Sequence, residues 1–436
     1  MKRIAVPLMV AVAGLGGCAP TRPMAAAGTA AQPVAAAAMD HRDDIVLAVA
    51  NPLAPPPPHA GSNLLGYAPP AGYGTGQHAA ATMDALKRRY GLHEVAAWPI
   101  KPLGLYCAVL RPPPGVSREA LIATLSRDRQ VQLAQPLQDF SVYSSAPEAG
   151  AAGHEAVRHY NDPYVDLQRG FVATDAAAAQ AYTQGAGVEV AVVDTGVDTR
   201  HPDLKGRIRD VRDVVDAAGG AFDGDHHGTE VAGIIAADGN NRRGIVGMAP
   251  RATLSVYKAC WYPQGPDAGA RCNSFTLAKA LAAVFDTPAR IVNLSLGGPA
   301  DPLLHRLLQQ LLDQGRVVVA AMPPDGRLDG FPDDAPGVLV VRTSRAAPAP
   351  PGVLSAPGDD ILTTQPNGAY DFTSGSSMAA AHVSGIAALL LSLSPGLDAQ
   401  TVHDLLLRTS KVSGGMLQVN AQAAVSALRG AGETPR

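Results

Sequence analysis

From residue 188 onward, the chain alternates short apolar runs with helical patterns. Five runs of mostly β-branched or small apolar residues recur there, at 188–193, 252–256, 291–296, 317–321 and 338–341. Strands with so few polar residues are covered on both faces, as in a parallel sheet. Helical stretches lie between them at 275–285 and 303–314. Alternating elements of this length predict a doubly wound parallel α/β sheet with helices on both faces.

Weaker patterns occur earlier in the chain. The spacing of Met83, Leu86 and Tyr90 predicts a helix that stops at Gly91. A second helix begins near Ser117, which is a suitable N-cap. Extended runs accompany these helices at 95–110, which holds two strands, and at 130–143. The order helix, two strands, helix, strand predicts a small α+β domain.

The first residues have the layout of an export signal. Lys2-Arg3 precedes a short apolar run that cannot span a bilayer as a stable helix. The run ends at Leu15-Gly-Gly-Cys18, which resembles the bacterial lipobox. That resemblance implies a signal peptide over 1–17, a lipid on Cys18 and a membrane anchor. Ala19 after the cysteine implies the outer membrane, and an ordinary signal peptide that contains a cysteine is the alternative.

Residues 18–78 are rich in alanine, proline and glycine and have almost no periodic apolar pattern. Pro55 to Pro58 stand in a row within this segment. Such composition cannot bury enough apolar surface to form a core. The segment is therefore predicted to be a disordered tether and not a domain.

Composition excludes some classes of function. Charged residues make up 17% of the 436 residues, and the formal net charge is -3. The basic clusters at 87–89 and 242–243 are short and isolated, so no nucleic-acid partner is predicted. No metal-ligand spacing is present, and the sequence predicts neither a metal site nor a cofactor.

Three motifs carry the candidate chemistry. They are Val190-Ala-Val-Val-Asp194-Thr-Gly-Val-Asp198, His227-Gly-Thr-Glu-Val-Ala-Gly233 and Gly375-Ser-Ser377-Met-Ala-Ala-Ala-His-Val-Ser-Gly385. Together they supply an acid, a base and a nucleophile. The three segments resemble the active-site motifs of the subtilases, the subtilisin-like serine proteases, in which the triad follows the same chain order. The resemblance implies a subtilisin-like peptidase domain over 155–430 and catalytic roles for Asp194, His227 and Ser377.

Each triad candidate stands where its role requires it. Asp194 ends a buried strand, where a carboxylate needs a hydrogen-bond donor such as an imidazole N–H. His227 opens a helix and would accept the proton of the nucleophile before passing it to the leaving amine. Ser377 begins an apolar helix, whose N-terminal N–H groups favour a developing oxyanion. The resemblance thus implies a serine endopeptidase that hydrolyses peptide bonds through an acyl-enzyme.

Three neighbouring residues are less suitable candidates. Asp198 is interpreted as a turn or surface carboxylate, and His226 as a loop residue, because the Gly-Thr and Val-Ala-Gly spacing fits only His227. His382 is interpreted as a packing residue of the last motif's helix. None of the three is assigned a catalytic role.

Substrate contacts also follow from the resemblance. Asn293-Leu-Ser-Leu-Gly-Gly298 is similar to the subtilase segment whose backbone pairs with an extended peptide. It implies substrate-binding roles for Ser295, Leu296 and Gly297. Pairing of this kind is β-augmentation, and it favours polypeptide substrates over small esters.

The small domain over 79–145 is similar to the pro-domain that subtilases carry before the peptidase domain. In the family this segment assists folding, inhibits the enzyme within the same molecule, and is removed by self-cleavage. The cut would fall between about Tyr143 and Tyr160. A lipid on Cys18 would then sit on the removed part. Processing could therefore release the enzyme, leave the two parts associated, or not occur, and the sequence does not distinguish these cases.

One departure from the family pattern bears on activity. Subtilases normally have Gly-Asn after the strand at 317–321, and the asparagine side chain donates to the oxyanion. This chain has Met322-Pro-Pro-Asp325-Gly326, which places Pro324 at or beside that position. Proline has no donor, and loss of one such donor in subtilisin costs on the order of 10²- to 10³-fold in rate. Two alternatives stay open: a catalytically impaired binding or regulatory lipoprotein of this fold, and a transpeptidating or cyclising subtilase.

Cysteine use is consistent with export. Cys260 and Cys272 flank a loop rich in proline and glycine and are predicted to form a disulfide in an oxidising compartment. Cys107 has no evident partner.

Overall fold

The computed structural model describes most of the chain. Its described residues are 36–52, 73–144, 160–215, 222–263, 269–344, 349–413 and 416–432. The predicted signal peptide, Cys18 and much of the predicted tether lie outside these ranges, as does the stretch between Ser144 and Tyr160 in which the end of the pro-domain was expected.

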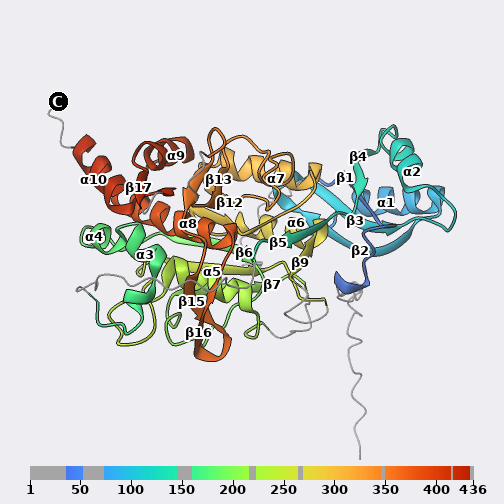
Figure 1. The fold of residues 1–436 in the computed structure, drawn as a ribbon. Coiled ribbons are helices and arrows are strands. Elements are labelled where there is room, and N and C mark those ends of the chain that lie inside the picture. Colours follow the sequence, from blue (N-terminus) through green and yellow to red (C-terminus); the bar gives the residue numbers. More distant parts are fainter. Residues whose placement is uncertain are drawn as a thin grey trace, which may run out of the picture. The chain divides into compact units, whose positions relative to one another are not determined.

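A seven-stranded sheet forms the centre of the larger part of the structure (Figure 1). Its strand order is β14-β13-β12-β10-β6-β8-β7, and every neighbouring pair is parallel. In chain order the strands are β6 (Glu189–Asp194), β7 (Ile208–Asp213), β8 (Thr253–Lys258), β10 (Ile291–Leu294), β12 (Val317–Ala321), β13 (Leu339–Thr343) and β14 (Leu354–Ala356). The predicted doubly wound parallel sheet is confirmed.

Five of the seven strands coincide with the predicted apolar runs. The edge strand β7 was missed because its sequence, Ile-Arg-Asp-Val-Arg-Asp, is mostly polar and no residue in it is fully buried. The short edge strand β14 was also missed. By contrast, every residue of β6, β10, β12 and β13 is buried, as expected for strands covered on both faces.

Helices cover both faces of the sheet (Figure 1). On one face α5 (His226–Ala236) and α8 (Ser376–Leu393) share a core with Val190 and Val192 of β6. On the other face α6 (Ser274–Val284) and α7 (Pro302–Asp313) pack against Ala191 and Val193. Helix α8 is long and apolar enough to cross a membrane, but 83% of it is buried inside the protein, so it is a core helix.

The described residues between 45 and 136 form a four-stranded antiparallel sheet with two helices. The sheet order is β2-β3-β1-β4. Its elements are β1 (Ile45–Ala50), α1 (Gln77–Tyr90), β2 (His93–Ile100), β3 (Leu105–Arg111), α2 (Arg118–Leu125) and β4 (Val131–Pro136). As predicted, α1 ends at Gly91, which has a left-handed backbone, and Ser117 caps α2 by accepting from Ala120 N–H.

Strand β1 corrects the predicted tether. Residues 18–78 were expected to hold no ordered structure, yet β1 lies between β3 and β4. The run Ile-Val-Leu-Ala-Val is buried on both faces. Ile45, Leu47 and Val49 contact the core beneath α1 and α2, whereas Val46 and Ala48 share a core with α6 and α7. The strand was overlooked because a long Pro/Gly-rich stretch separates it from α1.

The small sheet packs against α6 and α7 through its second face. Trp98 of β2 meets Phe275 of α6 edge-to-face, with ring centroids 4.5 Å apart.

After β4 the chain enters the larger part as β5 (Asp139–Val142), which joins β9 (Arg271–Asn273) and β11 (Leu296–Gly297) in a three-stranded sheet. The remaining elements are α3 (Arg169–Ala173), α4 (Ala176–Gln180), β15 (Ile361–Gln365), β16 (Ala369–Thr373), α9 (Ala399–Arg408), β17 (Lys411–Ser413), β18 (Met416–Gln418) and α10 (Ala421–Gly432).

Candidate active site

Asp194 and His227 form a buried pair at one end of the central sheet. Asp194 is the last residue of β6, and His227 is the second residue of α5. The Nδ1 atom of His227 lies 2.6 Å from Oδ1 of Asp194, and both residues are at most 2% exposed. This contact fixes the ring so that Nε2 is the nitrogen available for proton transfer.

The surroundings of His227 favour its protonated form. Burial opposes protonation, but the charge and hydrogen bond of Asp194, together with the charge of Glu230, outweigh it and raise the pKa of His227. A carboxylate in direct contact stabilises the imidazolium that general-base catalysis creates. The pair can therefore accept a proton from a nearby hydroxyl.

Ser377 is the second residue of α8 and is fully buried. Its hydroxyl donates to the carbonyl oxygen of Ser295, at 3.0 Å. Among the described atoms, Nε2 of His227 has no hydrogen-bond partner. Proton transfer to His227 therefore requires the Ser377 side chain to turn from Ser295 toward the imidazole.

The chain itself occupies the site in front of Ser377. Strand β5 pairs antiparallel with β11 on one side and β9 on the other. Val142 is paired with Leu296, and Ser141 with Gly297. The residue after the strand, Tyr143, donates its N–H to Ser377 Oγ at 3.3 Å and accepts from Ser377 N–H through its carbonyl oxygen at 3.4 Å.

Two of the three predicted substrate-binding residues thus contact the protein's own strand, and the third contacts Ser377. Leu296 and Gly297 form β11, and Ser295 accepts the hydroxyl of Ser377. Sequence reasoning placed an extended segment at 130–143 but did not show that its end enters the site. That pairing joins residues far apart in the chain, and no local pattern encodes it.

Tyr143 fills a recess whose walls need glycine. A Cβ atom on Gly297 would lie 2.5 Å from the Tyr143 hydroxyl, so a larger residue would displace the ring. Gly375 has a φ of 147°, which favours glycine, and a Cβ there would lie 2.2 Å from the Tyr143 carbonyl oxygen. These two positions let the backbone and side chain of Tyr143 approach Ser377 closely.

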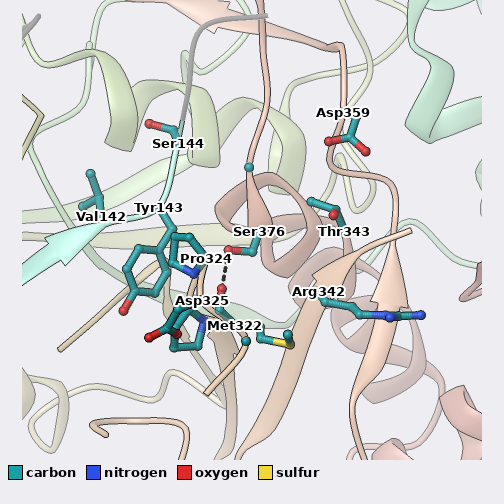
Figure 2. A pocket seen from close by; sticks show the side chains of 13 residues that line it. Val142, Tyr143, Ser144, Met322, Pro324, Asp325, Arg342, Thr343, Asp359 and Ser376 are labelled. Carbon is teal, nitrogen blue, oxygen red and sulfur yellow. Dashed lines mark hydrogen bonds between the residues drawn. The ribbon is translucent and has the colours of Figure 1, made fainter. Parts of the chain in front are cut away.

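A cavity of about 500 Å³ lies beside the Tyr143–Ser144 bond (Figure 2). Its walls include Pro324 and Asp325 on the loop after β12, and Ser376 donates to Met322 O and holds that loop against α8. Pro324 contributes no donor to this cavity. Asp325 accepts from Arg327 N–H within its own turn. Among the described residues, the recorded donor to the Tyr143 carbonyl is Ser377 N–H.

The three neighbouring residues lie outside this arrangement. His226 is the exposed first residue of α5, not a loop residue, and contacts Gln365. Asp198 is 4% exposed and accepts from Arg200 N–H and Gly368 N–H, so it is a buried turn residue and not a surface one. His382 contacts Met378 O, and burial lowers its pKa to about 4.

Cys260 and Cys272 are joined by a disulfide beside the site. The Cys260 N–H donates to the carbonyl of Asp194, and Cys272 pairs with Phe140 of β5. The bridge therefore connects the strand end that carries Asp194 to one wall of the peptide groove. Cys107 is buried in β3 and free, and burial raises the pKa of its thiol.

Comparison with known proteins identifies the family. The model of the subtilase family matches residues 185–432, more than half of the chain. The chain belongs to the subtilases. This subtilase is 32% identical over 286 residues to the thermophilic serine proteinase of Bacillus sp. (strain AK1), a match that covers 63% of this chain and 66% of that protein. It is 33% identical over 266 residues to thermitase of Thermoactinomyces vulgaris, covering 58% of this chain and 92% of that one.

The fold of this subtilase also has solved counterparts. Fervidolysin from Fervidobacterium pennivorans, described as a keratinolytic enzyme related to subtilisin, superposes with a TM-score of 0.68 at 20% identity. The superposition covers 88% of this chain and 61% of fervidolysin, which extends the shared fold beyond the peptidase domain. Subtilases are serine-type peptidases that act on polypeptides, so the family places this chain among the hydrolases.

Proposed function

We propose that the protein is a serine endopeptidase that uses Asp194, His227 and Ser377 and cuts its own chain between Tyr143 and Ser144. The observation that carries the proposal is the reciprocal contact of Tyr143 with Ser377. It sets the carbonyl carbon of Tyr143 in front of the candidate nucleophile. Residues 79–143, together with β1, then act as the pro-domain, because β5 blocks the groove that a substrate would enter.

The chemistry follows from the contacts. The Ser377 hydroxyl attacks the Tyr143 carbonyl carbon and gives its proton to His227 Nε2, while Asp194 stabilises the imidazolium. The Ser377 N–H supports the negative charge on the carbonyl oxygen. Collapse of this intermediate expels the amine of Ser144, which takes the proton from His227. Water then attacks the acyl-enzyme with His227 as base, which frees Ser377 and leaves a carboxylate on Tyr143.

Substrates in trans would take the place of β5. A polypeptide would lie extended between β9 and β11, as Asp139–Val142 does now. Phe140 gives the fourth residue before the cut a large apolar anchor, since it is 1% exposed and meets Phe331 edge-to-face with centroids 5.7 Å apart. We include export and a lipid on Cys18 in the proposal on the strength of the N-terminal sequence alone.

The alternative of an impaired binding or regulatory protein rests on Pro324. With one recorded donor to the Tyr143 carbonyl, cleavage in trans would be slow even where the strand binds well. Labelling with a fluorophosphonate separates the two readings: an adduct on Ser377 of pro-domain-free protein supports a peptidase, and a folded protein that takes no label supports the alternative. A cyclised instead of hydrolysed product would indicate transpeptidation.

Self-cleavage is tested by mass spectrometry of the purified full chain. We expect a fragment that ends at Tyr143 and one that begins at Ser144 from the wild type, and an intact chain from Ser377→Ala. Ser392→Ala serves as the matched control, because Ser392 lies on the same helix and its hydroxyl donates to Leu389 O away from the site. An intact wild type, or the same cut in Ser377→Ala, would contradict the proposal.

A further inference from the structure

A second buried ion pair lies next to Asp194 and His227. The Asp225 Oδ2 and Lys258 Nζ atoms are 2.7 Å apart, and the two side chains are 11% and 9% exposed. Removing two opposite charges from water costs more than such a pair usually returns, so stability alone is a weak reason to keep one. The location of the pair suggests another reason.

The Asp225–Lys258 ion pair connects the elements that carry Asp194 and His227, which are called the dyad below. Asp225 is the residue before α5 and stands two residues from His227, yet its side chain does not cap the helix. Instead Oδ2 accepts from the N–H of Gly196, at 2.7 Å, in the turn that follows Asp194. Lys258 ends β8 and is the parallel partner of Asp194 in β6. One carboxylate thus connects the turn after the acid, the start of the helix that carries the base, and the neighbouring strand.

Neutral hydrogen bonds already support the same junction. Gly228 N–H donates to Thr195 Oγ1 at 2.8 Å, and Asp198 N–H donates to Thr229 Oγ1 at 3.0 Å. These contacts would hold α5 against the turn without any charge. The ion pair adds a carboxylate beside the dyad and a cation that balances it.

The ionisable groups around the dyad make that balance relevant. Asp194 and Glu230 are two of them, and both act on His227. The others are Tyr262, whose hydroxyl accepts from His227 N–H, and Asp213, which lies opposite Lys258 in the backbone register of β7 and β8. Burial raises the pKa of Asp225 even with Lys258 in contact, and the negative charge of Asp194 adds to this. The protonation of His227 is therefore expected to respond to a change in one neighbouring charge.

We propose that Asp225 and Lys258 are positioning residues of the triad, which hold the turn after Asp194 against the start of α5 while their opposite charges cancel at His227. The proposal rests on the catalytic roles given above to Asp194, His227 and Ser377. It concerns residues outside the three motifs.

The test distinguishes the effect of the Asp225 charge from the effect of its hydrogen bond to Gly196. Asp225→Asn keeps an oxygen that can accept from Gly196 N–H but removes the negative charge that faces Lys258. Because a nearby positive charge disfavours the imidazolium, we expect the titration of His227 to move to lower pH by about half a unit or more. Adding Lys258→Met removes the cation, and the double variant should titrate within about 0.2 units of the starting protein.

Titration is followed by NMR of imidazole-¹⁵N-labelled protein in a Ser377→Ala background. This readout needs no turnover, so the pair can be tested even where the proposed peptidase activity fails. In the active background, the low-pH limb of kcat/KM for a peptide substrate should move with the NMR titration. A His227 titration that does not move in Asp225→Asn, or a shift that the double variant fails to reverse, would assign the pair a structural role only.

Discussion

The amide nitrogen of Tyr143 lies 3.3 Å from the hydroxyl oxygen of Ser377, and the amide nitrogen of Ser377 lies 3.4 Å from the carbonyl oxygen of Tyr143. Two contacts in opposite directions fix both the distance and the orientation of the peptide bond relative to the nucleophile. Such preorientation is a large part of what an enzyme contributes to an acyl-transfer step. The first prediction follows from the side chain at this position.

Truncating the side chain before the cut should slow self-cleavage. Tyr143→Ala removes an aromatic ring that lies against Gly297, and burial of such a ring contributes about 2–3 kcal/mol, or roughly 30- to 160-fold in rate. Tyr143→Phe keeps the ring and should cleave within about threefold of the wild type. Rates are measured as loss of intact chain after refolding. Equal rates for the alanine and phenylalanine variants would show that the recess does not select the side chain.

Restoring a donor at position 324 should accelerate hydrolysis. Pro324 lines the cavity beside the Tyr143 carbonyl and has no N–H. Pro324→Asn places a side-chain amide donor on the wall of this cavity, and we expect kcat for a peptide substrate to rise about 10- to 100-fold. Pro323→Asn, on the same loop and cavity wall, is the matched control and should change kcat little. An unchanged kcat in Pro324→Asn would mean that another group already serves the oxyanion.

Removing the disulfide should loosen one wall of the groove. The Cys260–Cys272 bridge closes a short loop, and its loss should lower the free energy of unfolding by about 3 kcal/mol in the chain-entropy description. Because Cys272 pairs with Phe140, Cys260→Ser/Cys272→Ser should also slow self-cleavage. Urea unfolding in the Ser377→Ala background measures the first effect. A reductant should destabilise the parent protein and leave the double variant unchanged, whereas an equal effect on both would contradict the prediction.

The carboxyl of Asp333 should make stability depend on pH. Burial raises its pKa from 3.8 to about 6, and among the described atoms its Oδ1 has no hydrogen-bond partner. The folded state therefore binds this proton more tightly than the unfolded state. The stability that protonation supplies is complete below pH 3.8 and is lost as pH rises through about 6.

Asp333→Asn mimics the neutral acid and should raise the free energy of unfolding by roughly 1–2 kcal/mol at pH 8, and by less at pH 5. Urea unfolding at the two pH values, again with Ser377→Ala, gives the comparison. Asp329→Asn is the control, since Asp329 lies on the same loop but is exposed and paired with Arg327. A gain that is independent of pH would exclude titration of Asp333 as its cause.

The sequence was most informative where burial is complete. Runs such as 188–193 and 317–321 revealed parallel strands because both faces are covered and nearly every position is apolar. The three motifs likewise placed Asp194, His227 and Ser377 at element ends, and the structure brings Asp194 and His227 into contact. Their catalytic roles stay predictions that the experiments above test.

The sequence was least informative where a structure depends on distant partners. Strand β1 is short and lies in Ala/Pro-rich sequence, so its place between β3 and β4 could not be read locally. The same holds for Tyr143, whose position follows from pairing across more than 100 residues of chain. The pair of Asp225 and Lys258 also escaped notice, because neither residue belongs to a motif and their contact joins separate elements.

The three-stranded sheet β9-β5-β11 has a consequence for where the enzyme works. While the Tyr143–Ser144 bond is intact, β5 competes with any substrate at an effective concentration set by the covalent chain, which for short connections reaches the millimolar range. After the proposed cut, the same strand would belong to a separate molecule, and its occupancy of the groove would depend on its dilution. If Cys18 carries the predicted lipid, only non-covalent contacts would then hold the peptidase domain at the membrane: the backbone hydrogen bonds of β5 and the core beneath β1. Release of the peptidase domain would become a reversible dissociation, and a high density of anchored pro-domains at the surface would favour rebinding.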